Sequence, residues 1–284
     1  MDYYVNIKGQ RVKVPQFSSG KCYLGLDRKS NIEFETFDEI TGLDQIPRLV
    51  EISITGIPVT KISNLEKLHE LKNLELIGNK ILKLSGLESL SSLIDLKIEE
   101  NLIKKIEGLE NLNNLKYLSL SGNRITKIEG LEKLKKIKIL YLAGNRITKI
   151  EGLKDLKDLD VIYFNMNNIS KIENVNQLSD LSTLDFTDNK ILRLENLAGL
   201  DNLVQLRIGK NDIDSLEGID VLPSLRHLDV RDTQISSLKP LYKHPNSGRL
   251  TITDEQFSDQ EISAFKKNCP NWMIDYELSL NEFD

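Results

Sequence analysis

Apolar residues recur along most of the chain with a fixed period of 22 residues. Within each period they follow the pattern L-x-x-L-x-L-x-x-N-x-I, as at Leu115, Leu118, Leu120, Asn123 and Ile125. The asparagine of this pattern stands at Asn79, Asn101, Asn123, Asn145, Asn167, Asn189 and Asn211, and no insertion shifts its phase. The pattern therefore predicts one solenoid of stacked coils rather than two separate domains.

The L-x-L centre of each period predicts a short β-strand. Alternate residues of a strand point to opposite sides, so the leucines face the interior and the x residues face outward. Stacked coils then form a parallel sheet. A buried leucine contributes about 1.5–3 kcal/mol, but a single coil has no second layer against which to bury it, so each coil depends on its neighbours.

Two columns of polar or small residues follow the strands. The asparagine is expected to turn inward and bond to backbone groups of its own coil and the adjacent one. Positions 42, 64, 86, 108, 130, 152, 174, 196 and 218 contain only glycine or asparagine. Both residue types accept positive φ and both can precede a short helix, so this column predicts a turn whose conformation the sequence leaves open. Few residues remain per coil, which favours short 3₁₀ or irregular segments over long helices.

The two ends of the chain differ from the repeats, as the open ends of a solenoid require. Alternating apolar residues around Lys8-Gly9-Gln10, and again at Cys22, Leu24 and Leu26, predict an N-terminal β cap over residues 1–36. The solenoid is expected over residues 37–257. Residues 258–284 predict a helix–strand cap, with a capping box at Ser258 and Glu261 and with Trp272 covering the last leucines.

Composition narrows the class of protein. The 284 residues are 39% hydrophobic and 29% charged, and their formal net charge of −5 argues against a nucleic-acid partner. The N-terminus lacks the apolar run of a signal peptide, and no segment has the length of a membrane helix, so we expect a cytoplasmic chain with no membrane contact. Cys22 and Cys269 are the only cysteines and lie at opposite ends, which excludes a disulfide framework or a four-ligand zinc site within one chain.

Catalytic and cofactor-binding patterns find no support in the sequence. The three histidines are His69, His227 and His244, and only His227 falls on an outward strand position. It lies near Asp229 and Asp232, but no nucleophile or further ligand pairs with it. The glycines follow the repeat and never gather into a phosphate-binding loop. We therefore expect no catalytic residue, no metal and no cofactor.

The repeated unit is a leucine-rich-repeat signature. It resembles the 22-residue class found in the protein phosphatase 1 regulatory subunit and, more distantly, the internalins. The resemblance implies an α/β leucine-rich-repeat solenoid, with a curved parallel sheet on the concave face and short 3₁₀ or irregular convex segments. It also implies that the concave face binds a globular protein. A phosphatase is one partner that the resemblance allows, but the shared residues are the buried ones and identify no partner.

The coils differ from one another in the residues at the outward strand positions. Early coils place acidic residues there, including Glu75 and Glu99. The middle coils place an apolar and aromatic patch, which consists of Tyr117, Ile139, Tyr141, Val161, Tyr163 and Met166. Later coils mix both charges, including Asp185, Arg207 and Arg231. Tyr141 and Tyr163 occupy the same slot of successive coils and are expected to be neighbours, with backbones about 4.8 Å apart.

These positions admit two interpretations. Tyrosine combines contact area with a hydrogen-bonding tip and suits a protein interface. It is also a common residue on any half-exposed strand. The charge pattern can likewise orient a dipolar partner or only keep the sheet face soluble.

The sequence favours a non-enzymatic protein-binding module, a regulatory subunit or scaffold that is a monomer by itself. The alternatives are a surface adhesion protein of internalin type and a self-associating architectural protein.

Overall fold

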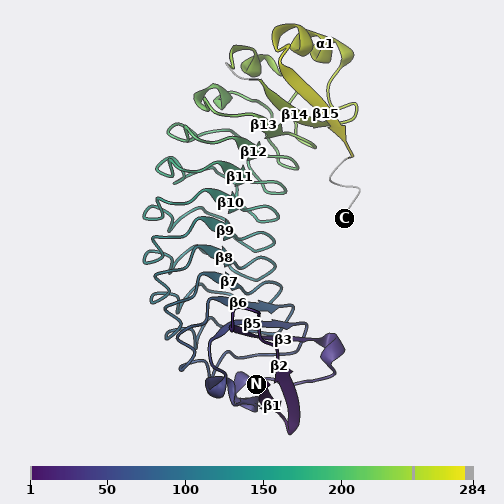
Figure 1. Cartoon of the computed structure of the whole chain (residues 1–284). Coiled ribbons are helices and arrows are strands. Elements are labelled where there is room, and N and C mark those ends of the chain that lie inside the picture. The colour runs from purple at the N-terminus through teal and green to yellow at the C-terminus, as the bar shows by residue number, and fades with distance from the viewer. Residues whose placement is uncertain (1, 245–246, 279–284) are drawn as a thin grey trace. The chain divides into compact units, whose positions relative to one another are not determined.

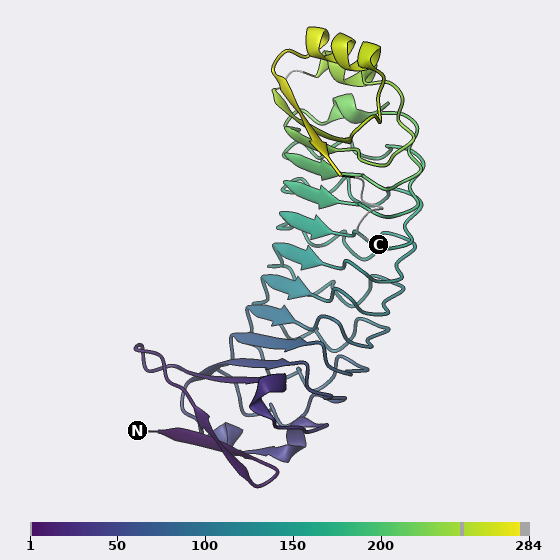
Figure 2. The same cartoon turned by 90° about the vertical axis from the view of Figure 1, so that its right-hand side faces the viewer.

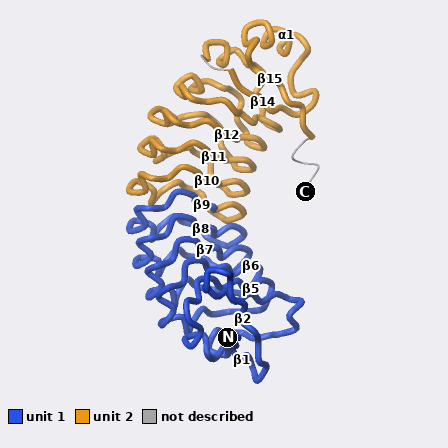
Figure 3. The backbone as a smooth tube through the Cα atoms, in the orientation of Figure 1, with its two compact units in different colours: residues 1–141 blue, residues 142–284 orange. Residues whose placement is uncertain are grey.

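The computed structural model describes residues 2–244 and 247–278 of the chain. It consists of coils that each contribute one strand to a parallel sheet (Figures 1 and 2). Two compact units divide the chain, residues 1–141 and residues 142–284 (Figure 3). Both units have the leucine-rich-repeat architecture that the period predicts.

Unit 1 contains two sheets. The parallel sheet has the strand order β3-β5-β6-β7-β8-β9, and the bounds of its strands are Cys22–Asp27, Leu49–Thr55, Asn73–Ile77, Asp95–Lys97, Tyr117–Ser119 and Ile139–Tyr141. The register advances by one repeat at each step, since Leu74 pairs with Leu96 and Leu96 with Leu118. A small antiparallel sheet is formed by β2 (Gln10–Val14), β1 (Tyr3–Ile7) and β4 (Ile40–Thr41). The predicted hairpin around Lys8-Gly9-Gln10 is thus present.

Unit 2 is built from coils of the same kind. Its parallel strands are β10 to β15, with the bounds Val161–Tyr163, Thr183–Asp185, Gln205–Arg207, His227–Asp229, Gly248–Thr253 and Trp272–Glu277. The one α-helix of the described chain is α1 (Asp259–Asn268), which lies at the end of the stack beside β14 and β15 (Figure 1). Short 3₁₀ helices lie between the strands, at Arg28–Ser30, Phe37–Glu39 and Leu43–Gln45 in unit 1 and at Ile219–Val221 and Lys239–Lys243 in unit 2.

The core is a stack of leucine and isoleucine layers. Residues such as Leu96, Leu118 and Leu184 are fully buried at the centre of their strands. The asparagine column lies beside them and bonds as expected. The Nδ2 atom of Asn101 donates to the carbonyl oxygens of Leu76, in the preceding coil, and of Glu99, each at 2.7 Å. Its Oδ1 atom accepts from the N–H of Ile81 at 2.9 Å, so one side chain joins two coils.

The glycine and asparagine column adopts one conformation throughout. All nine positions have positive φ, from 54° at Asn174 to 91° at Gly218. At Gly130 a Cβ atom would lie only 2.6 Å from the carbonyl oxygen of Ile106 in the preceding coil. Where asparagine occupies the column, its side chain uses the matching carbonyl: Asn174 Nδ2 donates to Ile150 O at 2.7 Å. The column is therefore a left-handed turn at which adjacent coils come close.

The N-terminal cap is more closely joined to the repeats than the sequence indicates. The strand β3 pairs in parallel with β5 and forms the first strand of the main sheet, with a register shift between Cys22 and Tyr23. Cys22 and Cys269 are buried and not disulfide-bonded, and burial raises the pKa of both thiols.

At the C-terminal end, Ser258 caps α1 by accepting from the N–H of Glu261 at 3.2 Å. The predicted capping box is only half formed, because the Glu261 carboxylate turns away to the N–H of Leu238 and the hydroxyl of Ser237. Trp272 is buried and packs edge-on against His244 and Phe265. The covering of the last leucines by Trp272 stays a prediction.

Candidate functional site

The surface that varies between coils is the side of the sheet opposite the leucine core, here called the open face. In unit 1 the paired residues form two columns on it. The first column runs Tyr23, Glu51, Asn73, Asp95, Tyr117, Ile139. The second column runs Ser53, Glu75, Lys97, Ser119, Tyr141. These positions alternate with buried core residues, so their side chains stand on the open face.

Tyr117 and Tyr141 form an aromatic pair on this face. Their ring centroids are 5.4 Å apart at an interplanar angle of 35°, and a hydrogen bond links the two side chains. Burial, followed by the proximity of Tyr141 and of the carboxylates of Glu99 and Asp95, raises the pKa of Tyr117. Both rings are half-buried, and the adjacent Ile139 is half-buried as well. Large contact area with a polar tip is what protein interfaces select.

Ser119 lies next to both tyrosines, since it follows Tyr117 by two residues and pairs with Tyr141. Its side chain is 0% exposed, and its Oγ atom has no hydrogen-bond partner among the residues that the structure describes. A buried hydroxyl without a partner costs about 1–3 kcal/mol. The small residue leaves room for the rings but places an unsatisfied polar atom at the base of the patch.

Carboxylates surround the first-column positions before Tyr117. Glu75 pairs with Lys97 at 3.4 Å, and the Lys97 ammonium also lies 5.6 Å above the Tyr117 ring centroid. The backbone N–H of Asp95 donates to Lys72 O at 3.0 Å, but its carboxylate forms no ion pair or hydrogen bond to any described residue. Burial raises the pKa of Asp95, Lys97 opposes that rise, and the negative charges of Glu75, Glu51 and Glu99 add to it. This part of the open face holds more negative charge than its one ammonium group neutralises.

A second aromatic pair lies at the other end of the first column, and the sequence analysis did not find it. Phe17 stacks on Tyr23 with ring centroids 4.9 Å apart and an interplanar angle of 28°. Phe17 is 43% exposed, although it is a large apolar residue. Tyr23 escaped notice because it pairs with Glu51, which is 28 rather than 22 residues further on. The alternation of Cys22, Leu24 and Leu26 is the signal in the sequence that could have placed Tyr23 on the outward side.

In unit 2 the open face begins with Val161 and Tyr163, which are half-buried on β10. Met166 follows the strand with a φ of 59° and is 56% exposed. Tyr141 ends β9 in unit 1 and Tyr163 ends β10 in unit 2, so the aromatic step expected between them stays a prediction.

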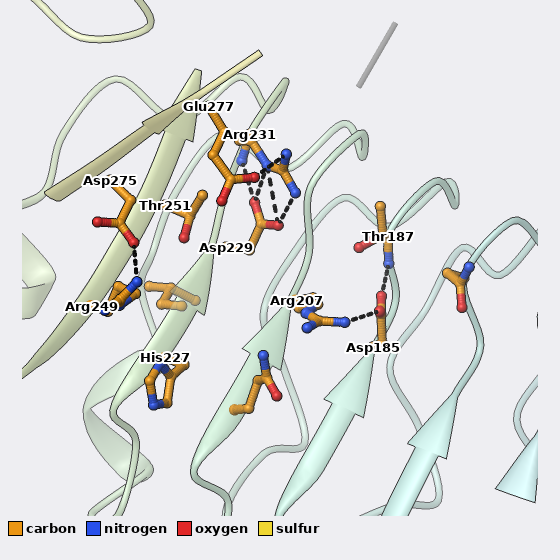
Figure 4. Close-up of a pocket in the computed structure, with 13 residues that line it drawn as sticks. Asp185, Thr187, Arg207, His227, Asp229, Arg231, Arg249, Thr251, Asp275 and Glu277 are labelled. Atoms are coloured by element: carbon orange, nitrogen blue, oxygen red, sulfur yellow. Dashed lines mark hydrogen bonds and ion pairs between the residues drawn. The ribbon is translucent and has the colours of Figure 1, made fainter. Parts of the chain in front are cut away.

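The charged residues of unit 2 line a pocket of about 360 Å³ on the open face (Figure 4). Arg207 pairs with Asp185 at 3.2 Å, and Arg249 pairs with Asp275 at 2.7 Å. Arg231 holds Asp229 and Glu277, each at 2.7 Å. Every arginine of the pocket therefore has a carboxylate partner, and with three guanidinium groups and four carboxylates this network is not a positive surface. His227 lies exposed at its margin.

Residues 2–244 and 247–278 contain no group of three or more histidine, cysteine or acidic side chains that could hold a metal ion. In the same ranges, no helix has the length and apolar character needed to cross a membrane.

Comparisons with known proteins agree with this architecture. The family described as leucine rich repeats in two copies matches residues 91–133, 113–157 and 135–177. Internalin C2 from Listeria monocytogenes is 31% identical, with a TM-score of 0.58 over 61% of this chain and 76% of the internalin. A second Listeria monocytogenes internalin is 26% identical, with a TM-score of 0.67 over 84% of this chain and 76% of the other. A leucine-rich-repeat protein from Leptospira interrogans is 25% identical, with a TM-score of 0.71 over 82% of this chain and 68% of the other.

No curated protein matches the sequence. The repeats and the structural similarity together place the chain among the leucine-rich-repeat proteins.

Proposed function

We propose that this chain is a non-enzymatic protein-binding module that holds a globular partner on its open face, as a regulatory subunit or scaffold. The leucine-rich-repeat fold suggests a protein partner. The observation that carries the proposal is the Tyr117–Tyr141 pair, two half-buried rings that stand together on an outward surface rather than in the core. An apolar cluster on a solvent-facing surface commonly forms part of an interface.

The residues proposed to contact a partner lie on the open face of each unit. In unit 1 they are Glu75, Glu99, Tyr117, Ile139 and Tyr141, and in unit 2 they are Val161, Tyr163, Met166, Asp185, Arg207 and Arg231. The two tyrosines of unit 1 are the anchors, since aromatic residues dominate binding energy at interfaces. Arg231 supports the surface through its ion pairs more than it contacts a partner, because its side chain is only 15% exposed.

Affinity purification with mass spectrometry tests the proposal. The wild-type chain is expected to retain a specific partner, and the double variant Tyr117→Ala/Tyr141→Ala is expected to lose it while melting at a similar temperature. Leu82→Ser is the matched control, because Leu82 is 54% exposed but lies outside the strands. Equal capture by the double variant and the wild type would rule out these tyrosines as anchors.

A surface adhesion protein of internalin type is the second candidate, and the similarity to two internalins favours it. The cellular location of the chain distinguishes the two candidate functions. The regulatory proposal expects the chain in the cytoplasm, and the adhesion alternative expects it in a cell-surface fraction. Light scattering of the purified chain addresses self-association, for which the proposal expects a monomer.

A further inference from the structure

Unit 1 presents two aromatic pairs on one face with acidic residues between them. The Phe17–Tyr23 pair lies at the β3 end of the first column, and the Tyr117–Tyr141 pair lies at β8 and β9. Between them lies a depression lined by Glu51, Asn73, Leu74, Glu75, Asp95 and Lys97. We propose that this face binds an extended basic segment of a partner protein, with an apolar side chain at each end and lysine or arginine between. This inference rests on the proposed function and names the chemistry of its partner.

The two aromatic pairs set the length of the segment. Four strand-to-strand steps separate β3 from β8 in the sheet, and steps of about 4.8 Å place Tyr23 and Tyr117 about 19 Å apart. An extended peptide advances about 3.3 Å per residue, so two apolar anchors about six residues apart reach both pairs. A segment lying across the strands meets the aromatic pairs at its ends and the carboxylates in its middle.

The charges between the pairs select a basic segment. Among the described residues, the Asp95 carboxylate has no ion pair or hydrogen bond, and the Glu51 carboxylate has only a long hydrogen bond of 3.4 Å from Asn73. Burial is the main cause of the raised pKa of Asp95, and repulsion from neighbouring carboxylates adds to it, so an incoming cation relieves an unfavourable contact. A partner with negative charge would add to it.

The chain itself shows that a cation fits there. The Lys97 ammonium lies between the Glu75 carboxylate, at 3.4 Å, and the Tyr117 ring, at 5.6 Å from its centroid. An ammonium or guanidinium group gains from both a carboxylate and an aromatic face. The buried Ser119 hydroxyl adds a polar atom without a partner in the neighbouring position of the second column.

Three synthetic peptides with a fluorescent label test the segment against the full chain. The first is Trp-Lys-Ser-Lys-Ser-Lys-Leu, whose apolar ends have the required spacing. The second replaces each lysine by glutamate. The third, Lys-Ser-Trp-Lys-Lys-Leu-Ser, has the same composition as the first with its anchors half as far apart. Fluorescence anisotropy is expected to show that the second and third bind at least about tenfold more weakly than the first, and that salt weakens the first.

Variants of the chain locate the binding. Asp95→Asn/Glu99→Gln is expected to weaken the first peptide about tenfold and to reduce its salt dependence. Phe17→Ser is expected to weaken it while leaving the difference between lysine and glutamate peptides intact. Glu66→Gln/Glu70→Gln is the matched control, since both carboxylates are exposed outside the strands. Absence of binding by the first peptide, or equal affinity for all three peptides, overturns the inference.

The outcome is distinguishable from a failure of the proposed function. If the partner captured by the wild-type chain is lost with Tyr117→Ala/Tyr141→Ala but retained by Asp95→Asn/Glu99→Gln, the open face binds protein and the basic segment is wrong. If neither double variant affects capture, the partner does not bind the open face of unit 1, and the proposed role of this face fails as well.

Discussion

Arg231 and Glu277 form an ion pair, with 2.7 Å between Nη1 and Oε2, that joins the residues after β13 to the last residue of β15. The same guanidinium donates to both carboxylate oxygens of Asp229, from Nε and Nη2. One side chain thus connects the final strand to a strand two positions away in the sheet. This contact lies within the pocket shown in Figure 4.

The variant Arg231→Ala is expected to lower the free energy of unfolding by about 3 kcal/mol, because Asp229 keeps a buried charge with no counterion. Arg249→Ala is the matched control. Its ion pair with Asp275 has the same 2.7 Å distance, but its side chain is 51% exposed, so the expected loss is about 0–1 kcal/mol. Urea denaturation of both variants measures the difference. Equal losses would mean that burial does not determine the strength of these pairs.

Asn101 and Asn79 occupy the same repeat position but do not make the same bonds. Asn101 Oδ1 accepts from the N–H of Ile81. Asn79 Oδ1 has no partner among the described residues, because the corresponding N–H, of Val59, donates to Ile57 O at 2.7 Å. Asn101→Ala is therefore expected to cost about 1 kcal/mol more than Asn79→Ala, one hydrogen bond being the difference. Thermal unfolding followed by circular dichroism compares them. A larger loss for Asn79→Ala would contradict this account of the column.

Gly130→Ala tests the close approach of adjacent coils. The new methyl group would lie 2.6 Å from the carbonyl oxygen of Ile106. The backbone at this position would also have to keep a φ of 70°, which alanine disfavours. Gly9→Ala shares only the second cost, since its φ is 83° and nothing lies within 4 Å of the added Cβ. We expect Gly9→Ala to cost about 1 kcal/mol and Gly130→Ala clearly more. Similar melting temperatures for the two variants would remove the steric argument.

Asp95→Asn is expected to stabilise the chain in a pH-dependent manner. Burial first, and then neighbouring carboxylates, raise the pKa of Asp95 in the folded state. The stability that this group contributes is therefore fully present below its unfolded pKa and is lost as pH rises through the folded value. The variant should melt at a higher temperature than the wild type at about pH 7, and the difference between the two melting temperatures should shrink at about pH 3.

Asp212→Asn is the control for the pH measurement, because Asp212 is exposed outside the strands. A stabilisation of Asp95→Asn that stays constant between the two pH values would show that the charge of this carboxylate is not its cause.

The repeat period of the sequence by itself determined most of the architecture. Strand alternation is local, so the pattern around Leu118 and Leu120 placed leucines inward and Tyr117 outward without knowledge of neighbouring coils. The fixed spacing then aligned equivalent residues, which is why the asparagine column could be predicted to bridge two coils. The hairpin around Gly9 and the N-cap of α1 at Ser258 could be predicted for the same reason, because turns and caps depend on nearby residues.

Only the tertiary structure decided which side chains meet. It gave the Gly/Asn column its left-handed conformation, turned Glu261 towards Leu238, and matched each arginine of the unit 2 pocket with a carboxylate. It also joined β3 to the main sheet, which brought the Phe17–Tyr23 pair onto the open face. These contacts depend on side-chain rotamers and on the pairing of β3 with β5, which does not follow the 22-residue spacing. The repeat pattern specifies neither the rotamers nor this pairing.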